Sequence, residues 1–421
     1  MAYVPIDYKR RCIMKDIQFR SLLIRLRQEH LLYGYDHLTT AQKEEFHQQI
    51  QQVDISLIER AKKKVAPSDQ THVTPMPCLE LPQIKKEAQR YQKAGLDALA
   101  NGQVGAVMLS GGMGSRLGCE EPKGTFDIGL TREISVFSLH MDTLKTISNQ
   151  AGRWVPLFIL TSRFNHDYIV DFYKLHHYFG YPSKYIHFFT QETNPCVNFS
   201  GKLMLEAPGV LAVSPNGNGG WFGSMLRAGR RETMDAYGLK WLNVFAVDNV
   251  LQKIADPLFV GATILSGYSS GAKVVKKAFP NEKVGVICLE NEKPTIVEYY
   301  EMNPDLAKQK NPNGEITFRF GVILNYLFDI SLLEKIDIDQ LPLHMVKKKV
   351  PYLNEYGVYV EPLVENAYKF ETLALDLISC MESCLPFEVE REKEFAPVKN
   401  SSGVDSPESA RMLLTKNGFI L

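Results

Sequence analysis

The stretch VMLSGGMGSRLGCEEPKG, residues 107–124, decides how the rest of the chain is interpreted. Its apolar start is typical of a buried strand, which leads directly into Gly111, Gly112 and Gly114. Glycines let the backbone approach a ligand closely, and the N–H groups exposed in such turns can hold phosphate oxygens. The stretch therefore predicts a phosphate-binding loop. A tight turn with surface basic residues is the alternative.

Two cationic side chains favour the phosphate interpretation. Arg116 and Lys123 lie in the same loop and suit a polyphosphate. Two familiar nucleotide motifs do not match, however. Leu117 stands where the dinucleotide fingerprint requires a glycine, and no G-K-[ST] sequence marks a Walker A loop. The loop thus indicates a polyphosphate site of another kind.

Six short apolar runs are typical of strands, and helical patterns lie between several of them. They are VGAVML (104–109), WVPLFIL (154–160), IHFF (186–189), WLNVFAV (241–247), VGVICL (284–289) and PTIVEYY (294–300). Continuous apolar strands that alternate with helices favour an α/β fold with a largely parallel sheet. Ligands bind such sheets at the carboxyl ends of the strands, so we expect the site in the loops that follow them.

The start of the chain looks different, because residues 1–100 are polar and mainly helical in pattern. Thr39 and Gln42 have the spacing of a capping box. Residues 65–82 hold four prolines and no apolar period, which predicts an extended connector. A further helix is expected from about residue 84 to residue 101.

We therefore expect three consecutive parts: the mainly helical residues 1–100, an α/β domain over residues 101–400, and a short tail over residues 401–421. In the tail, Ser406 and Pro407 have the pattern of an N-cap followed by proline at the first helical position. A short helix is predicted there.

Composition excludes several classes of protein. Lys plus Arg and Asp plus Glu both number 48, so the formal net charge is zero, which argues against a nucleic-acid binder. The hydrophobic fraction of 45% argues against a disordered chain. No secretory signal or membrane-length apolar run is visible, and the seven cysteines are scattered. We expect a cytoplasmic protein with reduced thiols and no membrane partner.

Two further loops carry polar groups suited to a ligand. SPNGNGGWFGSM (214–225) interleaves asparagines with glycines and could read a base edge or a sugar, although NGNGG is also an ordinary hairpin turn. NVFAVDN (243–249) ends an apolar strand in Asp248. A carboxylate there suits Mg²⁺, and the equal alternative is a helix cap.

Two more segments present single charges. Glu298 in VEYYEM (297–302) could accept hydrogen bonds from sugar hydroxyls. Lys399 in EFAPVKN (394–400) could reach a phosphate as a point charge. For each, a solvated surface side chain is the alternative.

Taken together, these motifs resemble the UDP-N-acetylhexosamine pyrophosphorylases and related UDP-sugar pyrophosphorylases. The resemblance spans roughly residues 38 to 415. It rests on LSGGMGSRLG with PKG, SPNGNGG, VDN, VGV, VEY and EFAPVKN in family order, and on LTTAQKEEFHQQIQQVD, HHYFGY, NFSGKLML, GAKVVKK and KKKVPYLN. It implies a nucleotidyltransferase core of glycosyltransferase-A-like, Rossmann-like α/β topology with a mixed central sheet.

The resemblance implies transfer of a uridylyl group from UTP to a sugar 1-phosphate, with Mg²⁺ and release of pyrophosphate. It implies that uridine and its phosphates contact Gly111, Gly112, Gln191, Gly217 and Asn218. Gly285 and Glu298 resemble the residues that hold the hexose.

Four charged residues resemble the family's charge-stabilising set. Arg116 resembles the residue that grips the leaving pyrophosphate, and Lys123 the lysine near the α-phosphate. Lys399 resembles the lysine that faces the sugar phosphate, and Asp248 the metal ligand. Phosphoryl transfer needs positioning and charge stabilisation more than covalent help, so no nucleophilic side chain is expected.

The chain departs from the family at the acetamido group. The N-acetylhexosamine enzymes carry an N-x-G-N segment, whose place is taken here by FRFGVILN (318–325) with Arg319 and Val322 at the two asparagine positions. Losing a designed polar contact can change selectivity greatly. N-acetylglucosamine 1-phosphate and glucose 1-phosphate are therefore both expected candidates. The family's larger C-terminal domain is expected to be missing or shrunken.

A non-catalytic protein that binds nucleotide sugars is the alternative function. Arg116, Lys123, Asp248 and Lys399 speak against it, because a binder need not keep the charge-stabilising set. UTP and a sugar 1-phosphate are the expected partners, and a monomer is slightly favoured.

Overall fold

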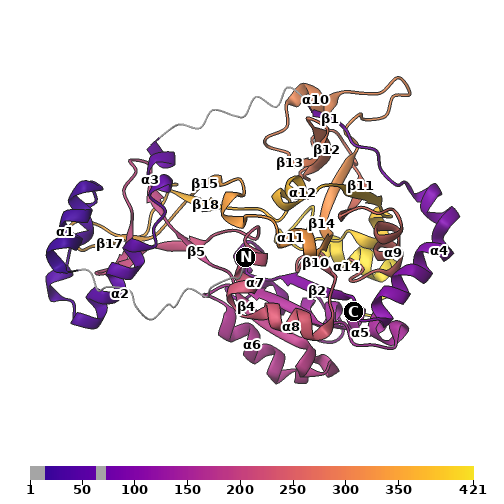
Figure 1. The fold of residues 1–421 in the computed structure, drawn as a ribbon, viewed down its shortest axis with the longest axis horizontal. Coiled ribbons are helices and arrows are strands. Elements are labelled where there is room, and N and C mark those ends of the chain that lie inside the picture. The colour runs from indigo at the N-terminus through magenta and orange to yellow at the C-terminus, as the bar shows by residue number, and fades with distance from the viewer. Residues whose placement is uncertain (1–14, 63–72) are drawn as a thin grey trace. The chain divides into compact units, whose positions relative to one another are not determined.

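The computed structural model describes residues 15–62 and 73–421 (Figure 1). The chain forms two compact units. The larger unit comprises Pro67–Glu192, Gly217–Pro342 and Thr372–Leu421, and the smaller unit comprises Met1–Ala66, Thr193–Asn216 and Leu343–Glu371. Within the described ranges, no helix is both long and apolar enough to cross a lipid bilayer.

These units differ from the three consecutive parts expected from the sequence. Two excursions from the middle of the chain, Thr193–Asn216 and Leu343–Glu371, join the N-terminal helices in the smaller unit. The larger unit takes in the α4 helix (Leu81–Ala100) at one end and residues 401–421 at the other. The reason is non-local packing, which hydrophobic periodicity does not reveal.

The larger unit is built on one ten-stranded mixed sheet, with the order β1-β12-β14-β10-β2-β3-β4 along its main path and with β11, β13 and β19 branching from it. The strands are β1 (Val73–Pro75), β2 (Val104–Leu109), β3 (Leu157–Thr161), β4 (Ile186–Thr190), β10 (Trp241–Ala246), β11 (Ser270–Lys276), β12 (Val286–Glu290), β13 (Lys293–Val297), β14 (Phe320–Asp329) and β19 (Cys384–Glu388). Figure 1 shows β2, β10 and β14 side by side.

The sheet is parallel in one half and largely antiparallel in the other. β10, β2, β3 and β4 pair in parallel, so their carboxyl ends meet at one edge. β14 runs antiparallel to β10, β11 and β12. The mixed sheet expected from the family resemblance is therefore present. The largely parallel sheet expected from the strand pattern holds only for the first half.

The two faces of this sheet are covered by different helices. Along β2, Ala106 and Met108 pack into one hydrophobic core, and Val107 and Leu109 into another, as strand alternation requires. The first core contains residues of α4, α5, α6, α9 and α14, and the second contains residues of α7, α8, α11 and α12. Burial on both faces explains why β2 is apolar throughout.

The remaining helices of the larger unit follow in chain order. They are α5 (Val136–Ala151), α6 (His166–Leu175), α7 (Trp221–Arg227), α8 (Arg230–Tyr237), α9 (Pro257–Leu265), α10 (Pro304–Lys308), α11 (Ile330–Leu333), α12 (Asp376–Cys380), α13 (Arg391–Glu394) and α14 (Pro407–Lys416).

The smaller unit combines three helices with three small sheets. Its helices are α1 (Asp16–Arg25), α2 (Thr40–Gln51) and α3 (Ile55–Lys62), and its strands are β5 (Thr193–Pro195), β6 (Val197–Asn198), β7 (Leu205–Ala207), β8 (Val210–Leu211), β9 (Val213–Pro215), β15 (His344–Lys348), β16 (Tyr352–Leu353), β17 (Tyr359–Val360) and β18 (Ala367–Glu371). The sheets have the orders β15-β18-β6, β17-β16-β7-β8 and β5-β9. Its core joins helix residues such as Phe19 and Phe46 to Leu205 and Phe370.

Both predicted helix caps are confirmed. The Thr39 side chain accepts from the Gln42 N–H at the start of α2, and Ser406 accepts from the Ser409 N–H with Pro407 at the first position of α14. The predicted connector is only partly described, because residues 63–72 lie outside the described residues. Within the rest of it, β1 takes up residues 73–75 and α4 begins at Leu81, and the residues between them form the connecting chain.

Candidate active site

The glycine-rich loop follows β2 and is closed by its own backbone. The Gly114 N–H donates to the carbonyl oxygen of Glu121 at 2.7 Å. A Cβ on Gly114 would lie 2.2 Å from the Sγ of Cys119 and 2.9 Å from the Glu121 oxygen, so the turn requires glycine. Arg116 lies exposed on the short turn η3 (Ser115–Leu117). The loop therefore has a fixed shape that presents this guanidinium to solvent.

Gln191 and Gly111 lie against each other. Gln191 follows β4, and its N–H donates to the Thr161 carbonyl oxygen at 2.8 Å, which extends the pairing with β3. The Gln191 side chain is buried, and a Cβ on Gly111 would come within 2.7 Å of its Oε1. The ends of β2 and β4 thus bring two of the predicted substrate-binding residues into one place.

Lys123 and Asp248 form the charged pair of the site. Lys123 lies on the turn η4 (Lys123–Thr125), where its N–H donates to the Gly112 carbonyl oxygen at 3.3 Å. Its Nζ is 3.8 Å from Oδ2 of Asp248, and the two side chains are 18% and 17% exposed. Asp248 follows β10, the parallel neighbour of β2. A cation and a carboxylate therefore meet at the carboxyl ends of adjacent strands.

Lys399 reaches this region from the far end of the chain. The Val398 N–H donates to the Asp248 carbonyl oxygen at 2.8 Å. The next residue, Lys399, donates its N–H to the Asp405 carbonyl oxygen at 2.7 Å. Lys399 therefore stands one residue from a backbone contact with Asp248.

Asp405 is a charged residue of this region that the sequence analysis missed. Burial raises the pKa of its carboxyl group, the carboxylates of Asp248 and Glu282 add to the increase, and the positive charges of Lys399 and Arg391 oppose it. The mutual influence places Asp405 in the same electrostatic environment as Asp248 and Lys399. The sequence offered only an aspartate in an expected tail, which is no signal by itself.

The two predicted hexose-binding residues lie together with Val322. The Val322 N–H donates to the Gly285 carbonyl oxygen at 2.8 Å. A Cβ on Gly285 would lie 2.9 Å from Ile296 Cγ2, 3.3 Å from Val322 Cγ2 and 3.9 Å from Glu298 Oε1. The group combines one carboxylate with an apolar branched side chain.

The other unusual residue of this segment, Arg319, faces acidic side chains of the protein. Its Nη2 is 2.5 Å from Glu80 Oε1, and its Nη1 is 2.9 Å from Glu315 Oε2. These ion pairs assign the Arg319 guanidinium a structural role in tying β14 to the start of α4.

The asparagine-glycine loop is held to the residues that precede α12. Gly217 has a φ of +89°, a conformation that favours glycine. The Asn218 Oδ1 accepts from the Ala374 N–H at 2.9 Å, and the Gly219 N–H donates to the Thr372 carbonyl oxygen at 2.9 Å. The Asn218 side-chain oxygen therefore serves to hold the loop in place.

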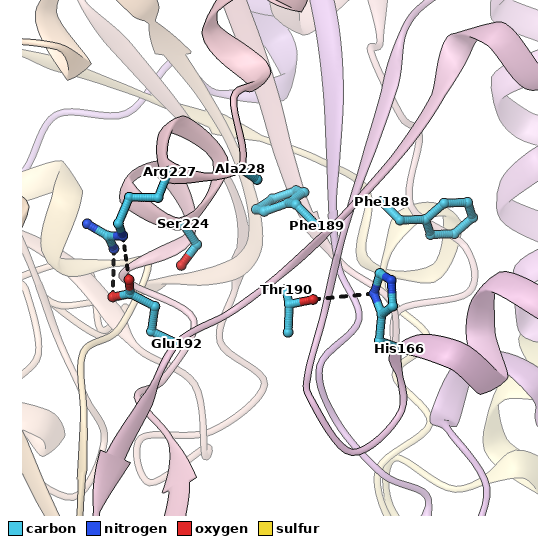
Figure 2. Close-up of a pocket in the computed structure, with 8 residues that line it drawn as sticks. All are labelled: His166, Phe188, Phe189, Thr190, Glu192, Ser224, Arg227 and Ala228. Atoms are coloured by element: carbon cyan, nitrogen blue, oxygen red, sulfur yellow. Dashed lines mark hydrogen bonds and ion pairs between the residues drawn. The ribbon is translucent and has the colours of Figure 1, made fainter. Parts of the chain in front are cut away.

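A cavity of about 390 Å³ lies beside Gln191 but is not the predicted site. Figure 2 shows its lining, in which Arg227 pairs with Glu192 and Thr190 lies 3.4 Å from His166 Nδ1. Its lining residues are His166, Phe188, Phe189, Thr190, Glu192, Ser224, Arg227 and Ala228. None of the predicted residues lines it, although Thr190 and Glu192 flank Gln191.

The contacts thus gather most of the predicted residues into four local groups within the larger unit. The first group is Gly111 with Gln191, and the second joins Gly112, Lys123, Asp248 and the segment of Lys399. The third is Gly285 with Glu298, and the fourth is Gly217 with Asn218. Arg116 stands apart on the exposed turn. Nucleotide chemistry needs glycine-rich loops, cationic side chains, a carboxylate and an amide that can hydrogen-bond to a base. The strand ends of the larger unit carry all of these groups.

Solved structures with the same fold define the class. The UDP-N-acetylglucosamine pyrophosphorylase of Trypanosoma brucei, in complex with an inhibitor, superposes with a TM-score of 0.74 at 25% identity, covering 96% of this chain and 85% of that one. A UDP-glucose phosphorylase of Trypanosoma brucei shares the fold with a TM-score of 0.63 at 15% identity, covering 88% of this chain and 75% of that one. The protein is a nucleotidyltransferase with a Rossmann-like core.

The family follows from the sequence comparisons. The family model of UTP–glucose-1-phosphate uridylyltransferase matches residues 43–420, and the chain belongs to this family. UDP-N-acetylglucosamine pyrophosphorylase of Saccharomyces cerevisiae is 32% identical over 429 residues, 95% of this chain and 89% of the yeast protein. UDP-N-acetylglucosamine diphosphorylase 2 of Arabidopsis thaliana is 32% identical over 416 residues, 92% of this chain and 81% of the plant protein.

Proposed function

We propose that the protein makes a UDP-sugar and pyrophosphate from UTP and a hexose 1-phosphate. The observation that carries the proposal is the meeting of Lys123, Asp248 and the Lys399 segment at the ends of β2 and β10. Membership of the uridylyltransferase family supports the same reaction. The alternative of a non-catalytic binding protein gains no support from the relatives.

In the proposed reaction, the phosphate oxygen of the sugar 1-phosphate attacks the α-phosphorus of UTP. A new O–P bond forms, the bond between the α-phosphorus and the bridging oxygen breaks, and pyrophosphate leaves with that electron pair. Lys123 would neutralise charge on the α-phosphate, Arg116 would hold the pyrophosphate, and Lys399 would orient the sugar phosphate.

Asp248 is the residue proposed to hold Mg²⁺. Within residues 15–62 and 73–421, no cluster of three or more His, Cys, Asp or Glu side chains could enclose a metal ion. A single carboxylate nevertheless fits Mg²⁺, which proteins often bind through one or two carboxylates together with substrate phosphates. The ion would supply neutralisation of phosphate charge when bound.

Two observations point to different sugars. The yeast and plant relatives are named for UDP-N-acetylglucosamine. Val322, by contrast, places a side chain without hydrogen-bonding groups beside Gly285, at the proposed hexose site. A plain hexose such as glucose 1-phosphate needs no acetamido contact there.

The test measures pyrophosphate release from UTP and Mg²⁺ with the 1-phosphates of glucose, galactose, N-acetylglucosamine, N-acetylgalactosamine and glucuronate. Turnover of one or more hexose 1-phosphates is expected, and absence of turnover with all of them would overturn the proposal. Val322→Asn should shift the ratio of kcat/KM towards the N-acetylated sugar if Val322 sets the choice. An unchanged ratio would remove Val322 from the sugar site.

We also propose that the protein is cytoplasmic and monomeric. The cysteines of the described residues are free thiols, as expected in a reducing compartment. Light scattering at micromolar concentration tests the monomer, and imaging of the tagged protein in its host tests the location.

A further inference from the structure

A cluster of three charged side chains is buried behind the proposed site. Lys273, on β11, is fully buried, and its Nζ lies 2.9 Å from Asp256 Oδ2 and 2.6 Å from Glu394 Oε2. Asp256 caps α9 by accepting from the Leu258 N–H, and Glu394 ends α13. One ammonium group thus joins a strand to two helix ends.

Lys273 and Asp256 are charged at neutral pH despite their burial. Burial alone would lower the pKa of Lys273, but the carboxylates of Asp256 and Glu394 outweigh it and raise that pKa. Burial alone would raise the pKa of Asp256, but the ammonium of Lys273 outweighs it and lowers that pKa. Removing Lys273 alone would take this ammonium group away from two buried carboxylates.

Glu394 is the first residue of the segment that carries Lys399. This segment lies along the residues that follow β10: the Asn249 Nδ2 donates to the Glu394 carbonyl oxygen at 2.8 Å, and the Ala396 N–H donates to Asn249 Oδ1 at 2.9 Å. The Val398 N–H then donates to the Asp248 carbonyl oxygen at 2.8 Å. Whatever fixes Glu394 therefore acts on the start of the segment that contacts Asp248 through Val398 and carries Lys399 next to it.

Asp256 lies at the far end of the loop that follows β10, residues 247–256. Just before it, the Ala255 N–H donates to Oδ1 of the buried Asn243 at 2.7 Å, and the Asn243 amide donates to Asn325 Oδ1 at 2.8 Å. Residues 247–256 are therefore held by buried polar groups at both ends. Lys273 links the end at Asp256 to the segment at Glu394.

We infer that Lys273 is a positioning residue for the reaction. Its ion pairs with Glu394 and Asp256 hold the 394–399 segment against Asp248 and so set the distance between Lys399 and the carboxylate of Asp248. Lys273 touches no substrate, because its side chain is fully buried. The role of Lys399 in this inference rests on the proposed function, whereas the positioning of the segment does not.

The test compares Lys273→Met/Glu394→Gln with the wild-type protein. The double substitution removes both charges of the ion pair that reaches the 394–399 segment, while Asp256 keeps its hydrogen bond from the Leu258 N–H. Lys276→Met is the matched control, because Lys276 lies on the same strand and pairs with Glu80 and the buried Glu388, neither of which belongs to the 394–399 segment.

Two readouts separate positioning from a general loss of stability. Hydrogen–deuterium exchange of the backbone over residues 394–400 should become roughly tenfold faster in the double variant and stay unchanged in Lys276→Met. The KM for the sugar 1-phosphate should rise roughly tenfold and kcat should fall, while the KM for UTP stays within about twofold.

Unchanged exchange over residues 394–400 in a folded double variant would overturn the inference. So would an equal rise of KM for both substrates, which general loosening of the fold would produce. If the double variant does not fold, the same two measurements are made on Glu394→Gln alone. This variant keeps Lys273 paired with Asp256. Wild-type protein without turnover would overturn the proposed function, and exchange would still decide whether Lys273 holds the segment.

Discussion

The glycine-rich loop of residues 110–124 and the loop of residues 247–256 supply opposite charges to one place, and they are held in different ways. The first closes on itself through backbone hydrogen bonds such as that from Gly114 to Glu121. The second is held by buried side chains of two strands, Asn243 on β10, which leads into the loop, and Lys273 on β11. The difference teaches that a substitution near Lys123 should act locally, whereas one behind Asp248 should also change stability.

The largest expected effect is on turnover, from Lys123→Ala in the first loop. Loss of a cation from the proposed phosphate site should lower kcat by about 100- to 1000-fold, as removal of a single charge-stabilising donor does elsewhere. The melting temperature should change little, because the side chain belongs to a loop and does not fill a core.

Steady-state kinetics and thermal denaturation check this prediction together. Lys174→Ala is the control, since Lys174 is an exposed lysine on α6 that pairs with Asp171. Near-normal turnover of Lys123→Ala would remove Lys123 from the phosphate site.

The second expected effect concerns the loop of residues 247–256. His140, which contacts this loop, should make the free energy of unfolding depend on pH. His140 Nε2 lies 2.8 Å from the carbonyl oxygen of Val247, the residue before Asp248. Burial lowers the pKa of His140 to about 4. The backbone hydrogen bond to Val247 and the Asp248 carboxylate act in the opposite direction, but burial outweighs them. Because the folded pKa lies below the unfolded value of about 6.5, the unfolded chain binds the extra proton as pH falls.

The stability that His140 contributes is therefore complete above about pH 6.5 and is lost as pH falls towards 4, by about 3 kcal/mol at most. Urea denaturation from pH 8 to pH 4 should show this loss in the wild-type protein and a smaller one in His140→Gln. Parallel curves for the two proteins would show that His140 does not titrate on unfolding.

The smallest effect is on UTP affinity, from Gly111→Ala. The added Cβ would lie 2.7 Å from Gln191 Oε1, so the glutamine side chain must move. We expect the KM for UTP to rise about tenfold, equivalent to about 1.4 kcal/mol, with little change in stability.

The double variant Gly111→Ala/Gln191→Ala sharpens this test. Alanine at position 191 removes the clash, so any loss of preference for UTP over TTP and ATP reports base reading by Gln191 itself. An unchanged KM for UTP in Gly111→Ala would show that Gln191 does not need its present position.

The strands of the larger unit could be predicted from the sequence where they are fully buried. The run at β2 is apolar from end to end, the run at β10 is apolar except for Asn243, and the structure confirms both strands. β11 was missed as a strand, since it carries the charged residues Lys273 and Lys276 within only seven residues. Its lysine at position 273 is buried only because two distant carboxylates compensate it, which periodicity cannot show.

The candidate site shows the same limit. Glycine spacing and strand ends indicated Gly111, Lys123 and Asp248 as candidate ligand contacts, and the family resemblance alone indicated Gln191. The structure brings these four residues together in pairs. Asp405 and Lys273 were missed because their signal is tertiary. An aspartate in an expected tail and a lysine in an apolar strand become informative only once their partners are known.

The hydrogen bond from Ala396 to Asn249 joins residues 147 positions apart, and this has a consequence for synthesis. A ribosome adding roughly 5 to 20 residues per second makes the second partner about 7 to 30 s after the first. The glycine-rich loop, whose partners are close in sequence, can close as soon as it emerges. The nascent chain can therefore close its glycine-rich loop well before Lys399 is synthesised, whereas the contact between Asp248 and the segment of Lys399 has to wait for this late part of translation.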